Sequence, residues 1–272
     1  MENVVELKSW DEFSSKTGLL ISKHRDLVES EQSHVTEFLF RGQPDYNFPL
    51  QSTFERRKYW SLKFSDYFRL AHRAKPEVET FAGERWEMPD YPRLLEWCEN
   101  YDSLSLDDFP AYEYLVYLRH HGFPSPLIDW SASPYIAAFF AFSSRHAVQA
   151  DKVSIYQFRE KRLPKKQGSS DNPQIKKLGP YVRSHRRHYL QQSHYTICGR
   201  YVDGEWQFAP HEEVFDLDIP DQDILTKYTL PASERSKVLR ELHQHGLNAY
   251  SLFQNEEALL ETIAYREFDR EH

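Results

Sequence analysis

The alternation of apolar and polar positions predicts short strands mixed with amphipathic helices. Strands are expected near residues 37–43, 127–131, 152–158, 194–197, 224–230 and 248–253. Helices are expected within residues 4–28, 111–121, 133–142, 232–245 and 256–268. Residues 58–110 are aromatic, charged and helical in period, with breaks expected at Pro76 and at Pro89 to Pro92. The pattern therefore predicts one α+β domain over residues 1–272, with a helical insertion at about 58–110.

The stretch from His120 to Phe142 joins a strand to a helix and concentrates polar groups at the joint. The apolar pair Leu127-Ile128 runs into Asp129-Trp130-Ser131, and Ser133-Pro134 is typical of a helix start. Backbone N–H groups point outward at such a joint, which suits anion binding or catalysis. The alternative is a packed hinge in which Asp129 caps the next helix.

Arg41 is the first candidate for ligand binding. It ends an apolar strand and precedes Gly42, which lets a ligand approach the backbone. A guanidinium placed there suits a phosphate or carboxylate. The alternative is a structural arginine that pairs with an acid of the chain.

Other candidates are weaker on local grounds. His120 and His121 are acid–base candidates, or cations that favour the end of a helix. The run from Arg186 to Ser193 combines bases, amides and Tyr189, which suits phosphate and base recognition. Glu256 begins the last predicted helix, where an acid also complements the helix dipole.

Composition narrows the functional class. The 18 Phe, 17 Tyr and 6 Trp supply enough apolar surface for a folded core. With only 9 Gly, the chain lacks the glycine-rich phosphate loops of common nucleotide-binding folds. The two cysteines and the histidines lack metal-ligand spacing, so no metal is expected. No apolar run is long enough to cross a membrane, and no signal peptide is recognisable, so we expect a soluble cytoplasmic protein.

Charge is unevenly distributed along the chain. The net charge is −8, yet residues 151–187 hold 11 Lys and Arg against three acids. Such a basic segment suits an anionic partner, either nucleic acid or the acidic part of the same chain. Lys165, Lys166, Arg186, Arg187 and Tyr189 are the candidates for contacts with nucleic acid.

Together these motifs resemble the FRG domain family. Phe40-Arg41-Gly42-Gln43 is similar to its opening motif, and Arg119 to Ala141 is similar to its second motif, with His120 at the family's histidine. Arg187 to Thr196 resembles the third motif, and Leu252 to Glu256 resembles the ending. The resemblance spans about residues 5–265. The chain departs from the family pattern at five positions: Arg119, Ser125, Pro126, Ser193 and Tyr195.

The order of these motifs resembles that of ADP-ribosyltransferases, which implies a split mixed β-sheet core. In that scheme Arg41, with Gly42 and Gln43, grips the NAD co-substrate. The wall of the nicotinamide-ribose site consists of His120, Asp129, Trp130, Ser131 and Tyr135. Gln192 or Glu256 then polarises the ribose hydroxyl in the transition state.

Three hypotheses follow. The first is an NAD-consuming ADP-ribosyltransferase of the toxin or phage-defence kind, which modifies RNA or single-stranded DNA and has an antitoxin partner. The second is a non-catalytic module that binds a nucleotide or nucleic acid. The third is a hydrolytic toxin that uses Asp129 and His120, for which the chain lacks a cluster of carboxylates.

Overall fold

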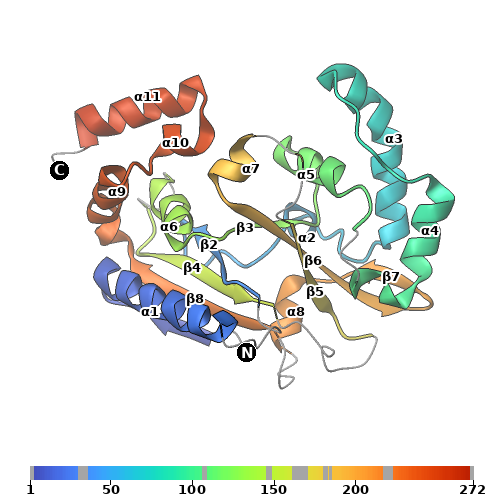
Figure 1. Ribbon diagram of the computed structural model, residues 1–272, viewed down its shortest axis with the longest axis horizontal. Coiled ribbons are helices and arrows are strands. Elements are labelled where there is room, and N and C mark those ends of the chain that lie inside the picture. The colour runs from blue at the N-terminus through green and yellow to red at the C-terminus, as the bar shows by residue number, and fades with distance from the viewer. Residues whose placement is uncertain are drawn as a thin grey trace.

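Strands from both ends of the chain meet in one open mixed sheet of eight strands (Figure 1). The computed structural model describes residues 3–29, 36–105, 109–144, 149–160, 171–179, 183, 186–216 and 223–269, apart from the side chains of 23–29 and 269. The strands are β1 (Asn3–Glu6), β2 (Leu39–Gln43), β3 (Ile128–Ser131), β4 (Lys152–Arg159), β5 (Gln174–Leu178), β6 (Ser193–Val202), β7 (Glu205–Phe208) and β8 (Ile224–Pro231). Their order is β1-β8-β4-β2-β3-β6-β5, and β7 pairs with β6. Among the strand pairs of the described residues, β1–β8 is parallel and the others are antiparallel.

Helices pack on both halves of this sheet. The α-helices are α1 (Trp10–Glu29), α2 (Thr53–Arg56), α3 (Phe64–Ala82), α4 (Tyr91–Glu99), α5 (Tyr112–His120), α6 (Pro134–Ser143), α7 (Arg186–Leu190), α8 (His211–Asp216), α9 (Arg235–Gln244), α10 (Ala249–Phe253) and α11 (Glu256–Ala264). Short helical turns are η1 (Tyr101–Ser105), η3 (Ala232–Glu234) and η4 (Tyr265–Asp269). In Figure 1, α1, α6 and α9 gather around β2, β4 and β8, whereas α3, α4 and α5 gather at the β6–β7 side.

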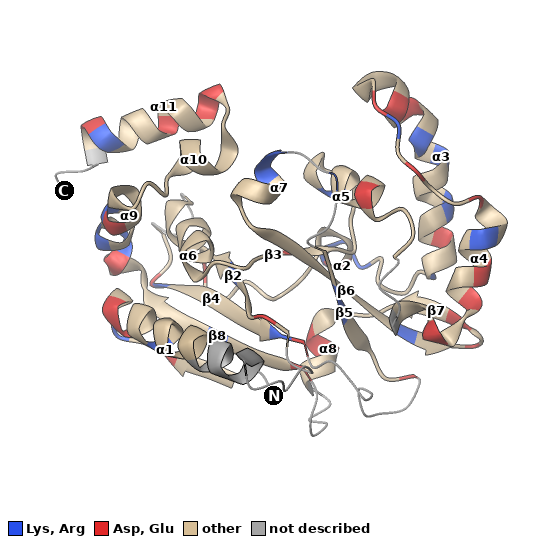
Figure 2. Cartoon of the chain, viewed as in Figure 1, with Lys and Arg blue, Asp and Glu red and all other residues tan. Residues whose placement is uncertain are grey.

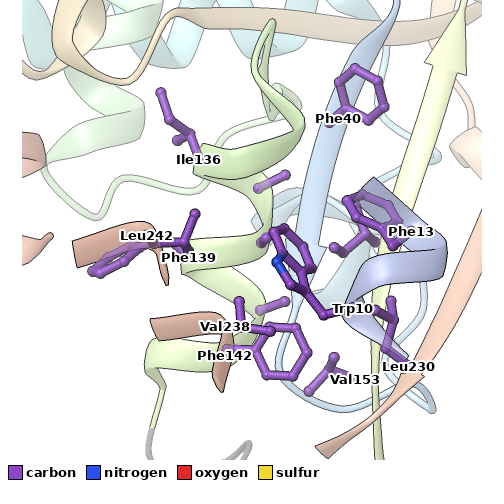
Figure 3. Close-up of a cluster of buried hydrophobic side chains, with 14 of the residues drawn as sticks. Trp10, Phe13, Phe40, Ile136, Phe139, Phe142, Val153, Leu230, Val238 and Leu242 are labelled. Carbon is purple, nitrogen blue, oxygen red and sulfur yellow. The ribbon is translucent and has the colours of Figure 1, made fainter. Parts of the chain in front are cut away.

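Helix α6 forms the centre of the first core. Ser133 accepts a hydrogen bond from the backbone of Ile136, and Pro134 opens the helix, as the sequence predicts. Its side chains are apolar on all sides, because one side covers the sheet and the other meets α1 and α9. Figure 3 shows Trp10 and Phe13 of α1 packed around it.

The second core lies under the helical region at 58–110. Aromatic side chains of α3 and α4 pack there with those of β6 and β7. The predicted break at Pro76 is wrong, because α3 continues through it to Ala82. Pro76 lies on the exposed side of the helix, where water can satisfy the freed carbonyl, while Phe64 and Phe68 anchor the helix in the core.

Several other elements differ from the sequence prediction. Residues 248–253 were expected to be a strand, but α10 forms there because Asn248 and Ser251 make a reciprocal capping box. Residues 174–178 were not predicted to be a strand, yet they form β5 and pair with β6. Strand β7 and the helices α7 and α8 were not anticipated.

Candidate anion-binding site at the junction of β2 and β3

The two halves of the sheet are joined at one paired position, where Phe40 of β2 lies opposite Ser131 of β3. By contrast, β2 pairs along its whole length with β4, and β3 pairs along its whole length with β6. Nη1 of Arg41 donates to the backbone carbonyl of Asp129 at 2.7 Å. The Arg41 side chain therefore links β2 to β3 at the point where their backbone pairing stops.

Asp129 is shared by two guanidinium groups. Its Oδ2 lies 2.5 Å from Nη2 of Arg119 and 3.9 Å from Nη1 of Arg41. The two arginine side chains are 15 and 16 % exposed, whereas the aspartate side chain is 34 % exposed. Each arginine also has a buried Nε without a hydrogen-bond partner. Oδ1 of Asp129 is likewise buried without a partner, so the two Nε–H groups are donors that the carboxylate does not use and that an anion can take up.

Electrostatics at the site favour a negatively charged ligand. Burial lowers the pKa of Arg41 to about 10, which leaves the guanidinium charged at neutral pH. Burial acts to raise the pKa of Asp129, but the charges of Arg119 and Arg41 outweigh it and the net shift is downward. Burial also lowers the pKa of Arg56, and the positive charge of Arg119 adds to that shift. Two guanidinium groups, those of Arg41 and Arg119, thus contact one charged carboxylate, and the charge of the exposed Arg56 acts on the same region, which gives an excess of two positive charges.

A wall of imidazole and phenol groups lies beside this cluster. Tyr195 of β6 is directly opposite Asp129 of β3 in the sheet. Its hydroxyl shares a hydrogen bond of 2.8 Å with Nε2 of His120, and His188 stacks on its ring. Burial lowers the pKa of His120 despite the nearby carboxylate, so the ring is neutral at neutral pH. His120 and Asp129 are thus brought together around Tyr195.

The sequence around this junction is known from a domain family. Residues 36–150 match the FRG domain. This match supports the family resemblance over the segment that carries Arg41, Arg119, His120 and Asp129. No curated protein and no solved structure matches the chain.

Within the FRG segment, Trp130 does not contribute to the predicted ligand wall. It is buried on the opposite face of β3, where its ring lies against Phe158. Its indole N–H donates to the hydroxyl of Thr196 at 2.9 Å. Neighbouring residues of a strand point to opposite faces, and Asp129 takes the face of the arginines.

Ser131 connects two segments of the chain. Its hydroxyl donates to the carbonyl of Gln191 at 2.8 Å and accepts from the backbone N–H of Ser133. Both bonds are internal to the protein, so the prediction that this hydroxyl binds a cofactor is not supported by its contacts. Ser131 instead fixes the turn before β6 against the start of α6.

Gly42 serves packing rather than ligand approach. A Cβ at this position would lie 1.9 Å from the carbonyl oxygen of Ala137 and 2.6 Å from the backbone N of Ala141. Helix α6 therefore fills the space that the sequence analysis assigned to a ligand. Gln43 is buried and donates to the carbonyl of Pro49.

Tyr135, Gln192 and Glu256 make no hydrogen bond, ion pair or ring contact with Arg41, Arg119 or Asp129 among the described residues. The ring of Tyr135 meets the edge of Trp10, at 6.0 Å between centroids. Gln192 is exposed, has a left-handed backbone (φ 47°), and accepts from Ala132 through its carbonyl. Glu256 is exposed in the first turn of α11, and no strand precedes it. Among the described residues the side chains of Gln192 and Glu256 form no hydrogen bond.

The third FRG-like motif attaches α7 to α10. The guanidinium of Arg187 lies over the ring of Phe253 at 5.5 Å, and the side-chain amide of Gln191 donates to the carbonyl of Leu252. Arg186 and Tyr189 are exposed on the same short helix. Lys165 and Lys166, predicted to bind nucleic acid, lie outside the described residues.

A buried chain of hydrogen bonds next to the site, here called the relay, was not predicted from the sequence. Nδ1 of His211 donates to Glu55 at 2.6 Å, and the hydroxyl of Thr196 donates to Nε2 of His211 at 3.2 Å. The indole of Trp130 completes the chain by donating to Thr196. All of these groups are buried, so the relay fixes α2 to β6 and β3. A glutamate next to Arg56 was the only local signal for it.

Two other kinds of feature, a metal cluster and a membrane span, are absent from the described part of the chain. No group of three or more His, Cys, Asp or Glu side chains there is arranged to hold a metal ion. No helix among the described residues is long and apolar enough to cross a membrane.

Proposed function

We propose that this protein is an NAD-dependent ADP-ribosyltransferase that modifies nucleic acid and acts in the cytoplasm as a bacterial toxin or phage-defence effector. The observation that carries the proposal is the pair Arg41 and Arg119 around Asp129, at the single point where the halves of the sheet join. The resemblance to ADP-ribosyltransferases implies an arginine or histidine on the first core strand, and Arg41 lies on β2 in the middle of the sheet.

The ligand chemistry matches NAD. Its pyrophosphate carries two negative charges, and Arg41, Arg56 and Arg119 exceed Asp129 by two positive charges. Guanidinium groups bind phosphate oxygens through two parallel hydrogen bonds, and Arg41 and Arg119 each have an unpartnered Nε–H donor. Arg41 and Arg119 would hold the pyrophosphate, while Asp129 orients both guanidiniums.

The transfer breaks the bond between nicotinamide and ribose C1′ and releases neutral nicotinamide, and an acceptor oxygen or nitrogen forms the new bond to C1′ as its proton passes to water. Positive charge develops on the ribose, so a carboxylate near it stabilises the transition state. We assign that role to Asp129 in place of Glu256, because Asp129 lies among the arginines and is charged at neutral pH. The neutral ring of His120, held by Tyr195, lines the same site.

Release of nicotinamide from labelled NAD, with RNA or single-stranded DNA as acceptor, tests the proposal. Arg41→Gln should slow release about 100-fold, because it removes two charge-assisted hydrogen bonds to the pyrophosphate. Arg93→Gln is the matched control, since this exposed arginine lies on α4, outside the site, and should leave the rate unchanged. Absence of nicotinamide release and of label transfer with every acceptor would refute the proposal.

A non-catalytic nucleotide-binding module is the second candidate. It is favoured by the exposed positions of Gln192 and Glu256, whose side chains form no hydrogen bonds among the described residues. In that case the protein binds NAD or another nucleotide and Arg41→Gln abolishes binding, yet no nicotinamide is released. Calorimetric titration beside the release assay separates the two functions.

A further inference from the structure

Five consecutive exposed residues follow the buried part of α2: Arg56, Arg57, Lys58, Tyr59 and Trp60. Three are cations and two are aromatic, and the rings of Tyr59 and Trp60 are 42 and 41 % exposed. In Figure 2, the blue of Lys and Arg marks the chain near α2. Basic and aromatic side chains side by side suit a ligand with alternating phosphates and bases.

The cations of this segment are not neutralised by the chain. The side chains of Arg57 and Lys58 form no hydrogen bond or ion pair within the described part of the protein. Arg56 donates only to the backbone carbonyl of Gln51. The one adjacent acid, Glu55, is buried and bonded to His211. The charges of Arg57 and Lys58 therefore remain available to solvent, whereas that of Arg56 also acts on the anion site.

The aromatic residues differ in how they are held. Tyr59 sits with its edge on Phe54, at 5.5 Å between centroids. Trp60 has no ring contact and no hydrogen bond within the described residues, although tryptophan is a residue that proteins usually cover. Exposed indole faces of this kind are stacking platforms for unpaired bases.

The chain beneath the segment is rigid. Ser52 caps α2, and Thr53 donates to the carbonyl of Ser125. The relay from Glu55 fixes the helix from the other side. Lys58 then takes a left-handed backbone (φ 60°) and its N–H bonds to the carbonyl of Glu55, so the turn is closed. The side chains are thus presented on a pre-organised support, which reduces the entropy lost on binding.

The segment also adjoins the anion site. Thr53 is tied to Ser125, which leads within four residues to Asp129. The charges of Arg56, Arg119 and Asp129 act on one another. A ligand that runs along residues 56–60 would therefore end beside Arg41 and Arg119.

We propose that residues 56–60 bind single-stranded nucleic acid, with Arg57 and Lys58 on phosphates and Trp60 stacked on a base. The inference rests on the proposed function in one respect, since it places the acceptor strand beside the reacting site. Binding itself requires no NAD, so it can be measured separately.

Fluorescence anisotropy of labelled 12-nucleotide RNA and DNA strands, without NAD, tests the inference. Arg57→Gln with Lys58→Gln should weaken binding and lower the slope of log affinity against log salt by about 1.4, because each lost phosphate contact accounts for about 0.7. Trp60→Ala should weaken binding roughly tenfold or more through lost stacking. Arg85→Gln with Arg93→Gln, and Phe81→Ala, remove the same charge and an exposed ring from α3, α4 and the loop between them, and should change nothing.

Several outcomes would overturn the inference: no binding of either strand by the wild type, equal affinity in the 56–60 variants and the controls, or equally tight binding of duplex. A salt slope of the wild type below about 1.4 would overturn it even where a variant fails to fold. If strands bind at residues 56–60 but nicotinamide is never released, only the proposed function fails. If nicotinamide is released while no strand binds, only the further inference fails.

Discussion

Asp129 illustrates how one carboxylate stabilises an otherwise repulsive arrangement. Arg41 and Arg119 are largely buried, and each depends on this acid for compensation of its charge. Like charges held together away from water are costly when their common partner is removed. The same arrangement that prepares the site for an anion therefore makes the fold depend on a single acidic residue.

Asp129→Asn should accordingly lower the free energy of unfolding by about 2 kcal/mol, because it keeps the shape of the side chain but leaves two guanidiniums uncompensated. Urea denaturation measures the loss. Asp66→Asn, which removes the partner of Arg69 on the surface of α3, is the control and should change stability by less than about 1 kcal/mol. Pyrophosphate should restore more stability to Asp129→Asn than to the wild type. Equal losses in the two variants would contradict the role of Asp129.

At the scale of elements, the contact of α6 with β2 decides the geometry of the first core. Gly42 allows the backbones to touch, and the apolar side chains of α6 then fill the space between the sheet and α9. The glycine of the Phe-Arg-Gly motif is therefore explained by helix packing, and the arginine beside it by charge.

Gly42→Ala should destabilise the protein by about 3 kcal/mol, since its Cβ would overlap the backbone of α6 and force the helix away from the sheet. Gly18→Ala is a matched control inside α1, where nothing lies within 4 Å of the added Cβ. The Gly18→Ala substitution lowers the conformational entropy of the unfolded chain, so it should stabilise the protein by up to about 1 kcal/mol. Chemical denaturation of both variants gives the comparison, and a neutral Gly42→Ala would rule out the close contact.

At the scale of the whole molecule, buried histidines set the response to acid. His194 lies near the ammonium of Lys177, the carboxylate of Glu37 and His188. Burial and then the charge of Lys177 lower the pKa of His194 to about 4, and burial lowers the pKa of His120 as well. Both side chains are neutral in the folded protein at a pH where they are protonated in the unfolded chain.

Stability should therefore fall as the pH decreases from about 6.5 towards 4, because the unfolded state takes up protons that the folded state refuses. Thermal melts across this range measure the slope. His194→Gln should flatten it, whereas His121→Gln, at an exposed position, should not. An unchanged slope in His194→Gln would show that other groups control acid unfolding.

The parts predictable from the sequence are those with local causes. The apolar run before Arg41 and the Ser133-Pro134 helix start act within a few residues, and the structure has them as predicted. The partnership of Arg119 with Asp129 was not predictable, because it depends on how α5 meets β3. The side of β3 to which Trp130 points was not predictable for a related reason. Both faces of a central strand are covered, so the residue type does not show to which face a side chain points. In α10, the caps at Asn248 outweighed a strand-like composition.

The single pair between β2 and β3 also bears on what can fold alone. The FRG segment ends at residue 150, just before β4, and it contains neither β4 nor β6, the strands that pair along β2 and β3. Cut out at these boundaries, its two strands would keep one shared position and expose both outer edges. The FRG segment is thus a sequence unit embedded in a larger folding unit, and autonomy begins only when the flanking strands are included.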